Sequence, residues 1–324
     1  MLTLKDLVTI GEILIDLTYS GRQNGVPVYV ANPGGAPANV AVAAARLGAD
    51  SAFIGKVGND YYGGFLRDTL TENKVDTSGM LTDASAPTTL AVVSLTDAGE
   101  RSFSFYRRNC ADTLLSPDEV SDELLGNTRF LHFGSVSLTD DPARTATLFA
   151  AKRAKELGAT VTYDPNYRAN LWNSETEAVE RMKSVLGFVD ILKISDEELP
   201  LLTGTDDPEA GTRQLFDEYG ISLILLTLGA DGAYYRRGGE TGRAEGFKVK
   251  VADTNGAGDT FFGAFLSRMA ALGVYKPGEL TAEQLFDSVR TANLAASLTT
   301  SRHGAIPAMP DLGELEAKLK AEVK

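Results

Sequence analysis

One short segment of this sequence combines residue types that can bind an anion and remove a proton. The segment from Asp253 to Asp259 reads DTNGAGD, and an apolar periodic stretch after it predicts a helix. Small residues leave the main chain accessible, so N–H groups at the helix start can bind a phosphate with help from the helix dipole; they belong to Gly256, Ala257 and Gly258. Asp259 is placed to accept a proton from an attacking hydroxyl. The alternative interpretation is a tight turn followed by an ordinary acidic first helical turn.

A second group of residues, near the N-terminus, has the donors and acceptors that orient a polyol. Gly34 and Gly35 precede an alanine-rich helix, and paired glycines let a ligand approach the main chain closely. The amide of Asn39 can donate to and accept from sugar hydroxyls, and Asp16, at the end of the first predicted strand, offers acceptors to two neighbouring hydroxyls. The alternatives are a structural turn for the glycines and a helix cap or solvated loop acid for Asp16.

Strand-like and helix-like segments alternate along the chain and predict the scaffold that positions these residues. Apolar runs predict buried strands at residues 7–15, 52–57, 160–163, 191–194 and 223–228. Periodic segments between them predict helices that include residues 38–47, 65–73, 142–157 and 208–219. The alternation indicates a mostly parallel sheet that is covered on both faces. Ligands bind at the carboxyl ends of such strands, where Asp16, Asp60, Asp164 with Asn166, Ser195 and Thr227 are expected.

Two segments depart from this pattern, because residues 26–30 and 88–106 alternate apolar and polar side chains. Such alternation predicts half-exposed antiparallel strands, with a hairpin turn at residues 97–99 in the second segment. We interpret them as a small β-sheet lid, formed by about 17–33 and 88–108, within a single domain of residues 1–324. An uncovered apolar face seeks a partner, so we expect a homodimer through the lid.

The overall composition limits the classes of partner. The chain has 44 acidic and 31 basic side chains and a net charge of −13, which repels nucleic acid and anionic membrane surfaces. No stretch has the roughly 20 apolar residues that cross a bilayer, and the N-terminus lacks the features of a secretory signal. The single cysteine, Cys110, excludes an intramolecular disulfide and fits a reducing compartment. We therefore expect a soluble cytoplasmic protein that binds neither nucleic acid nor membrane.

The segment DTNGAGD and the string GGAPANVA from Gly34 resemble the two signatures of the ribokinase-like (PfkB) family of carbohydrate kinases. The resemblance runs from the first strand to a Gly-Ala-Ile-Pro segment that starts at Gly304, with the motifs in family order. It implies an α/β fold, namely a ribokinase-like three-layer α/β/α core with a mostly parallel sheet plus a small β-sheet lid. It also implies phosphoryl transfer from ATP, with Asp259 as the catalytic base and the sugar held by Asp16, Gly34, Gly35 and Asn39.

The same resemblance implies where the nucleotide and the metal ions bind. Glu198 occupies the position of a glutamate that organises Mg²⁺ through water, whereas Ser195 replaces the asparagine of the family motif. A turn after the strand at 223–228 resembles the family's nucleotide-binding turn, and the C-terminal region resembles the part that forms the adenine pocket. The implied nucleotide-binding residues are Ser195, Thr227, Gly229, Gly232, Gly256, Gly258 and Asn293. The residues implied for a monovalent cation such as K⁺ are Asp253, Asn255 and Gly304.

Several strings favour the fructokinases within this family. They include HFGS from His132, DPNYR from Asp164, KISDEE from Lys193 and FYR from Phe105. We therefore expect D-fructose as the acceptor, with Arg107 and Arg168 as further sugar-binding residues.

Other functions remain open at this point. The segment from Arg108 to Cys110 departs from the Asn-Pro-Ser of fructokinases, so the acceptor is less certain than the reaction. The rivals are 2-keto-3-deoxygluconate, whose carboxylate Arg107 would clamp, and another sugar or nucleoside of the PfkB kinases. A catalytically silent regulatory protein on this fold would have lost Asp259 or the glycine run, and both are intact. A dinucleotide-dependent oxidoreductase is disfavoured because no Gly-x-Gly-x-x-Gly turn follows the first strand.

Overall fold

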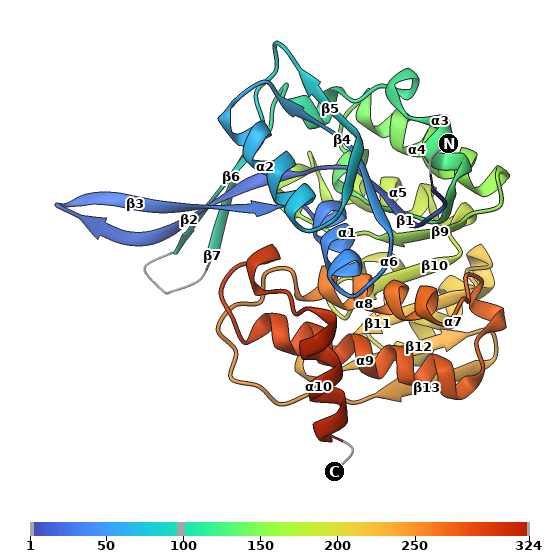
Figure 1. The fold of residues 1–324 in the computed structure, drawn as a ribbon. Helices are drawn as coiled ribbons and strands as arrows, with labels where there is room; N and C mark the ends of the chain where they lie inside the picture. The colour runs from blue at the N-terminus through green and yellow to red at the C-terminus, as the bar shows by residue number, and fades with distance from the viewer. Residues whose placement is uncertain (1–2, 96–100, 323–324) are drawn as a thin grey trace.

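A nine-stranded sheet forms the centre of the molecule in the computed structural model, which describes residues 3–95 and 101–322 (Figure 1). Its strands lie in the order β13-β12-β11-β10-β9-β8-β1-β4-β5. They are β1 (Lys5–Ile10), β4 (Ser51–Gly58), β5 (Asp76–Asp83), β8 (Thr128–Gly134), β9 (Thr160–Asp164), β10 (Ile191–Ser195), β11 (Leu223–Thr227), β12 (Ala233–Arg237) and β13 (Glu240–Ala244). All neighbours pair in parallel except at the edge formed by β12 and β13. The predicted mostly parallel sheet is confirmed.

Helices cover both faces of this sheet, as the alternation of side chains along β11 shows. Leu223 and Leu225 pack in one core cluster with residues of α8 and α9, whereas Ile224 and Leu226 pack in another with residues of α4, α5 and α7. This alternation is the period of a strand that is buried on both sides. The helices are α1 (Ala36–Arg46), α2 (Tyr61–Glu72), α3 (Asp122–Gly126), α4 (Ala143–Glu156), α5 (Glu175–Ser184), α6 (Glu198–Thr203), α7 (Pro208–Tyr219), α8 (Ala257–Ala271), α9 (Ala282–Thr300) and α10 (Leu312–Glu322).

A second, four-stranded sheet projects from the core (Figure 1). Its order is β3-β2-β6-β7, with β2 (Leu14–Gln23), β3 (Val26–Gly34), β6 (Leu90–Leu95) and β7 (Arg101–Tyr106). The two hairpins are antiparallel, but β2 and β6 pair in parallel where the hairpins meet, so the sheet is mixed rather than wholly antiparallel. The predicted small sheet is present, and we call it the lid sheet below. The predicted hairpin turn at 97–99 lies outside the described residues.

The first predicted strand, residues 7–15, is wrong in one respect, because the chain changes sheets within it. β1 ends at Ile10 in the large sheet, and β2 begins at Leu14 in the lid sheet. Between them Gly11 has a φ of 147°, and a Cβ there would lie 2.7 Å from the ring of Pro37. Apolar residues stand on both sides of the break since both halves are buried, which hides it from periodicity. Asp16 is consequently a lid residue and not the end of a core strand.

In the described ranges no helix combines the length and the apolar character that crossing a bilayer requires.

Candidate active site

The start of α8 is shaped to receive an anion. Gly256 caps the helix with a φ of 72°, and a Cβ at this position would lie 2.8 Å from the Cβ of Ala305, so both conformation and space favour glycine. Among the described residues, no side chain caps this helix end. The N–H groups of the first turn, unpaired within a helix, therefore point outward at the positive end of the helix dipole.

Asp259 lies in this first turn, is only 7% exposed, and is held from two sides. The amide Nδ2 of Asn39, on α1, donates to its Oδ2 at 2.8 Å, and Nδ2 of Asn166 donates to its Oδ1 at 3.0 Å. Burial raises the pKa of Asp259, and the hydrogen bond from Asn39 and the charge of Lys193 oppose that rise. The result is a fixed carboxylate with more affinity for a proton than an exposed aspartate has.

Lys193 places a cation beneath the helix start. Its Nζ lies 2.8 Å from Oδ2 of Asp164, with both side chains buried, and a Cβ at Gly258 would lie 2.8 Å from the same Nζ. Burial lowers the pKa of Lys193, but the carboxylates of Asp164 and Glu198 more than offset it, so the net shift is upward. The ammonium is therefore charged and adjacent to the anion-binding main chain. Sequence reasoning missed this residue, although a lysine inside the buried strand ILKIS was a usable signal.

The predicted sugar-binding residues gather where β2, β3 and α1 meet. A side chain at Gly34 would collide with the carboxylate of Asp16, and a Cβ at Gly35 would lie 2.6 Å from the carbonyl oxygen of Glu12. Burial raises the pKa of Asp16 to about 6, while the nearby Arg168 opposes this shift and Asp259 adds to it. Asp16 therefore lies within electrostatic reach of both Arg168 and the proposed base.

A cleft of about 930 Å³ extends from Asp259 along the carboxyl ends of β10 and β11. It brings together residues that are distant in the sequence. Those predicted from the sequence that line it are Arg168, Ser195, Glu198, Thr227, Gly229, Gly232, Asn255, Gly256, Ala257, Gly258, Asp259 and Asn293. Asn166 and Lys193 also line it; Asn166 was expected at this edge of the sheet without an assigned role, and Lys193 was not among the predicted site residues.

Glu198 and Ser195 form a local hydrogen-bonded unit at the start of α6. Oε2 of Glu198 accepts from the N–H and the hydroxyl of Ser195 at 2.8 and 3.0 Å, and its Oε1 accepts from the N–H of Tyr167 at 2.8 Å. The serine that replaces the family's asparagine thus fixes the glutamate. Oε1 retains an acceptor site that can face a hydrated cation.

Asn293 supports the far wall of the cleft through the main chain. Its Nδ2 donates to the carbonyl oxygens of Ala244 and Glu245 at 2.9 and 3.2 Å. A Cβ at Gly232 would collide with the carbonyl oxygen of Ala244, so glycine at that position also lets two chain segments cross closely. These contacts fix the segment that follows β13.

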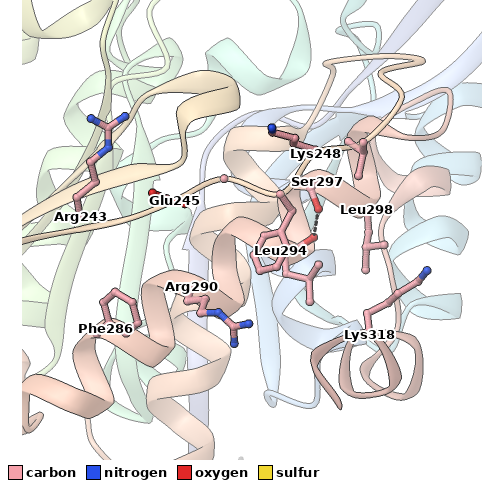
Figure 2. Close-up of a pocket in the computed structure, with 12 residues that line it drawn as sticks. Arg243, Glu245, Lys248, Phe286, Arg290, Leu294, Ser297, Leu298 and Lys318 are labelled. Atoms are coloured by element: carbon pink, nitrogen blue, oxygen red, sulfur yellow. Dashed lines mark hydrogen bonds between the residues drawn. The ribbon is translucent and has the colours of Figure 1, made fainter. Parts of the chain in front are cut away.

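A second pocket lies on the outer side of this wall (Figure 2). Its volume is about 840 Å³, and it shares residues 246–249 and Ser297 with the cleft. In Figure 2, Lys248, Arg290 and Lys318 surround Leu294 and Leu298 at the pocket floor. The two spaces are therefore neighbours, separated by the segment 246–249 and by part of α9.

The residues implied for a monovalent cation also meet. Oδ1 of Asp253 accepts from the N–H of Asn255 at 2.8 Å, and its Oδ2 accepts from the N–H of Gly304 at 3.1 Å. The two loops that carry these residues are thus joined just before α8. Within the described ranges, no group of three or more His, Cys, Asp or Glu side chains is arranged to hold a metal ion.

Arg107 is buried and bonded to other side chains, whereas the sequence predicted a side chain that reaches the sugar. Its side chain is 6% exposed; Nε donates to Oδ2 of Asp112 and Nη1 donates to the hydroxyl of Thr139, each at 2.6 Å. Two of its three nitrogens are therefore committed to the protein. The direct sugar contact of Arg107 stays a prediction, and these partners indicate a further role.

A buried carboxylate at a helix start, beside main-chain N–H groups and a buried lysine, is the arrangement expected of a phosphotransferase that activates a hydroxyl. The family model for pfkB family carbohydrate kinases matches residues 4–312. Fructokinase-1 of Zea mays is 42% identical over 313 residues, covering 95% of this chain and 96% of that protein.

Solved structures give the same result. Fructokinase from Xylella fastidiosa with bound ATP superposes with a TM-score of 0.91 at 34% identity, covering 99% of this chain and 100% of the other. Fructokinase from Vibrio cholerae O395, with fructose, ADP and a calcium ion, gives 0.88 at 36% identity, with coverages of 97% and 98%. The chain therefore belongs to the pfkB family of carbohydrate kinases and has the ribokinase-like fold.

Proposed function

We propose that this protein is an ATP-dependent fructokinase, which transfers the γ-phosphoryl group of ATP to a hydroxyl of D-fructose. The observation that carries the proposal is the position of Asp259. Its carboxylate lies in the first turn of α8, held by Asn39 and Asn166, beside main-chain N–H groups that suit a phosphate.

In this mechanism Asp259 accepts the proton of the attacking hydroxyl. Burial raises its pKa, which increases its strength as a base, and the hydrogen bonds from Asn39 and Asn166 fix its position. Asp16 and the main chain at Gly34 and Gly35 bind the other hydroxyls. The positive charge of Arg168 acts on both carboxylates, since it opposes the rise in the pKa of Asp16 and of Asp259.

The phosphoryl group is held by the N–H groups of Gly256, Ala257 and Gly258, with the charge of Lys193 behind them. These donors are fixed before the reaction, so they stabilise the transferring group without reorganisation. We propose that Glu198 would hold Mg²⁺ through water, and that this ion would neutralise phosphate charge when bound with ATP. The joined loops at Asp253, Asn255 and Gly304 suit a monovalent cation such as K⁺, which carbonyl and carboxylate oxygens coordinate.

A panel of acceptors tests the proposal. Purified protein with ATP and Mg²⁺ is assayed for ADP formation with D-fructose, 2-keto-3-deoxygluconate, ribose and adenosine. We expect the highest kcat/KM for fructose. A far higher value for 2-keto-3-deoxygluconate would reject fructose as the acceptor and retain the kinase, and no turnover of any acceptor would favour a silent regulatory protein.

The lid sheet supports a proposed homodimer. Its strand β3 exposes Val26, Tyr29 and Val30 at 64, 41 and 48% of their surfaces, and apolar side chains in such numbers favour a covering partner. Sedimentation analysis of Val30→Lys checks the proposal, since a lysine there should produce monomers. A wild-type protein that sediments as a monomer at micromolar concentration contradicts it.

The proposed location is the cytoplasm. Cys110 is free and buried, which suits a compartment that keeps thiols reduced. Fractionation of cells that express the full chain checks this location.

A further inference from the structure

A buried group of polar side chains lies where both hairpins of the lid sheet leave the core. It consists of Glu12, Thr89, Arg107 and Asp112, each no more than 6% exposed, and we call it the lid-root network. Glu12 lies between β1 and β2, Thr89 precedes β6, and Arg107 follows β7. Asp112 lies in the short helix η1 (Ala111–Leu114). The network therefore meets the chain at three of the four points where it passes between core and lid.

Asp112 joins the two ends of the second hairpin. Its Oδ1 accepts from the hydroxyl of Thr89 at 2.5 Å, and its Oδ2 accepts from Nε of Arg107 at 2.6 Å. The carbonyl oxygen of Thr89 also accepts from the N–H of Ile15 at 3.1 Å, which links it to β2. One carboxylate thus fixes the entry and exit of β6 and β7 relative to the first hairpin.

Glu12 extends the network to the predicted sugar-binding turn. Its Oε1 accepts from the N–H of Ala36 at 3.1 Å, which is the first residue of α1. The N-cap residue Gly35 has no side chain that could accept from the first N–H groups of α1. Glu12 therefore caps the helix from a distant position in the sequence. The same helix carries Asn39, whose amide holds Asp259.

Glu12 and Arg107 attract each other across the network. Burial raises the pKa of Glu12 to about 7, and the positive charge of Arg107 opposes this rise. Oε2 of Glu12 and Nη2 of Arg107 are both buried and have no hydrogen-bond partner among the described residues. A buried charged group with unmet hydrogen bonds costs stability relative to apolar packing, so maximal stability does not explain these residues.

We propose that Glu12, Arg107 and Asp112 are positioning residues for the sugar, because they hold the lid roots in register with the Gly34-Gly35 turn and the start of α1. They act through Asp16, Gly34 and Asn39 and do not need to touch the sugar themselves. None of them lines the nucleotide cleft, so their effect falls on acceptor binding, on closure of the lid over the acceptor and, through Asn39, on the placement of Asp259. The inference rests on the proposed sugar kinase activity.

Two conservative variants test the network. Glu12→Gln keeps an acceptor for the N–H of Ala36 but removes the charge opposite Arg107. Arg107→Lys keeps the charge but removes the fork that reaches Asp112 and Thr139. The matched control is Lys5→Met, because Lys5 is equally buried and paired with Asp50 and Asp76 at 3.0 and 3.1 Å, at the opposite end of β1.

We expect each network variant to raise the KM for fructose by about 10- to 100-fold, because Arg107→Lys loses hydrogen bonds of a charged group and Glu12→Gln loses the charge that strengthens its hydrogen bond. The Kd for ATP without sugar should stay within about twofold of wild type. ATP hydrolysis relative to sugar phosphorylation should rise, since a poorly seated lid admits water. The double variant should lose less than the product of the two single effects, because the residues act as one unit.

Lys5→Met should lower the melting temperature and leave the KM and the hydrolysis ratio unchanged. The inference is overturned if both network variants behave like this control, or if they weaken ATP binding as much as fructose binding. Should Arg107→Lys not fold, Asp112→Asn replaces it, and Glu12→Gln still decides. A wild-type protein that phosphorylates no sugar rejects the proposed function instead, so the two failures are distinguishable.

Discussion

Replacing Asp259 by asparagine separates proton removal from phosphate binding. The substitution keeps the size of the side chain and removes its ability to accept a proton. Both neighbours of Asp259 present an amide Nδ2 to it, so an asparagine amide would place its own NH₂ against the donor of Asn39 or of Asn166. Asn39 can relieve this conflict, because its Oδ1 is buried without a partner among the described residues and a rotation of the amide presents it.

The expected loss in kcat is about 10²- to 10⁴-fold, the contribution of a positioned general base. This corresponds to about 3–5 kcal/mol in the activation barrier. The stability should change by no more than about 1 kcal/mol, because the lost hydrogen bond to a charged group is offset by removal of a buried carboxylate. ATP affinity should stay within a factor of about three, since the anion site is built from main-chain N–H groups.

Single-turnover kinetics with fructose, thermal unfolding and titration of ATP measure the three quantities. A variant that phosphorylates fructose within tenfold of the wild-type rate would falsify the assignment of Asp259 as the base. A variant that loses rate, stability and ATP binding together would show that Asp259 holds the fold of the site and that the rate alone says nothing about proton transfer.

Three further perturbations test other parts of the site. Asn166→Ala should lower kcat about tenfold and move the acidic limb of the pH–rate profile to higher pH. The hydrogen bond from Asn166 lowers the pKa of Asp259 in the native protein, so its removal raises that pKa. An unshifted limb contradicts this. Asp16→Asn should raise the KM for fructose. It should also raise stability by about 3 kcal/mol at pH 8 and by little at pH 4, as measured by thermal unfolding. The sign follows because burial raises the folded pKa to about 6, so the native state binds the proton more tightly and the contribution of Asp16 to stability is lost as pH rises through that value. Gly258→Ala should weaken ATP binding and kcat through collision with Lys193, whereas Gly64→Ala, in open space on α2, should leave both unchanged; equal effects in an ATP titration would show that Lys193 simply moves away.

The parallel core was predictable because each of its strands is a short apolar run between periodic helices. The predicted segments 160–163 and 191–194 correspond to β9 and β10, and 208–219 coincides with α7. The start of α8 was equally predictable, since its small residues and its aspartate are neighbours in the sequence. Local patterns therefore sufficed wherever the chemistry depends on one continuous segment.

Contacts between distant segments were not predictable in the same way. The amide of Asn166 meets a carboxylate 93 residues away, and nothing near it in sequence signals this pairing. Arg107 follows a half-exposed strand and is typical of a surface cation, yet Asp112 and Thr139 bury it. The change of sheet after Ile10 was hidden since burial on both sides of the break preserves an apolar run.

The two hairpins of the lid sheet each begin and end at neighbouring points. Leu14 pairs with Gly34 across the first hairpin, and Leu90 pairs with Tyr106 across the second. The two ends of each hairpin are therefore adjacent, so the hairpin of another kinase can replace it without a change in the path of the core chain. The residues proposed to hold the nucleotide phosphates lie outside both hairpins, so the proposed acceptor site and the proposed subunit contact can diverge by replacement of short inserts while the proposed chemistry of transfer stays unchanged.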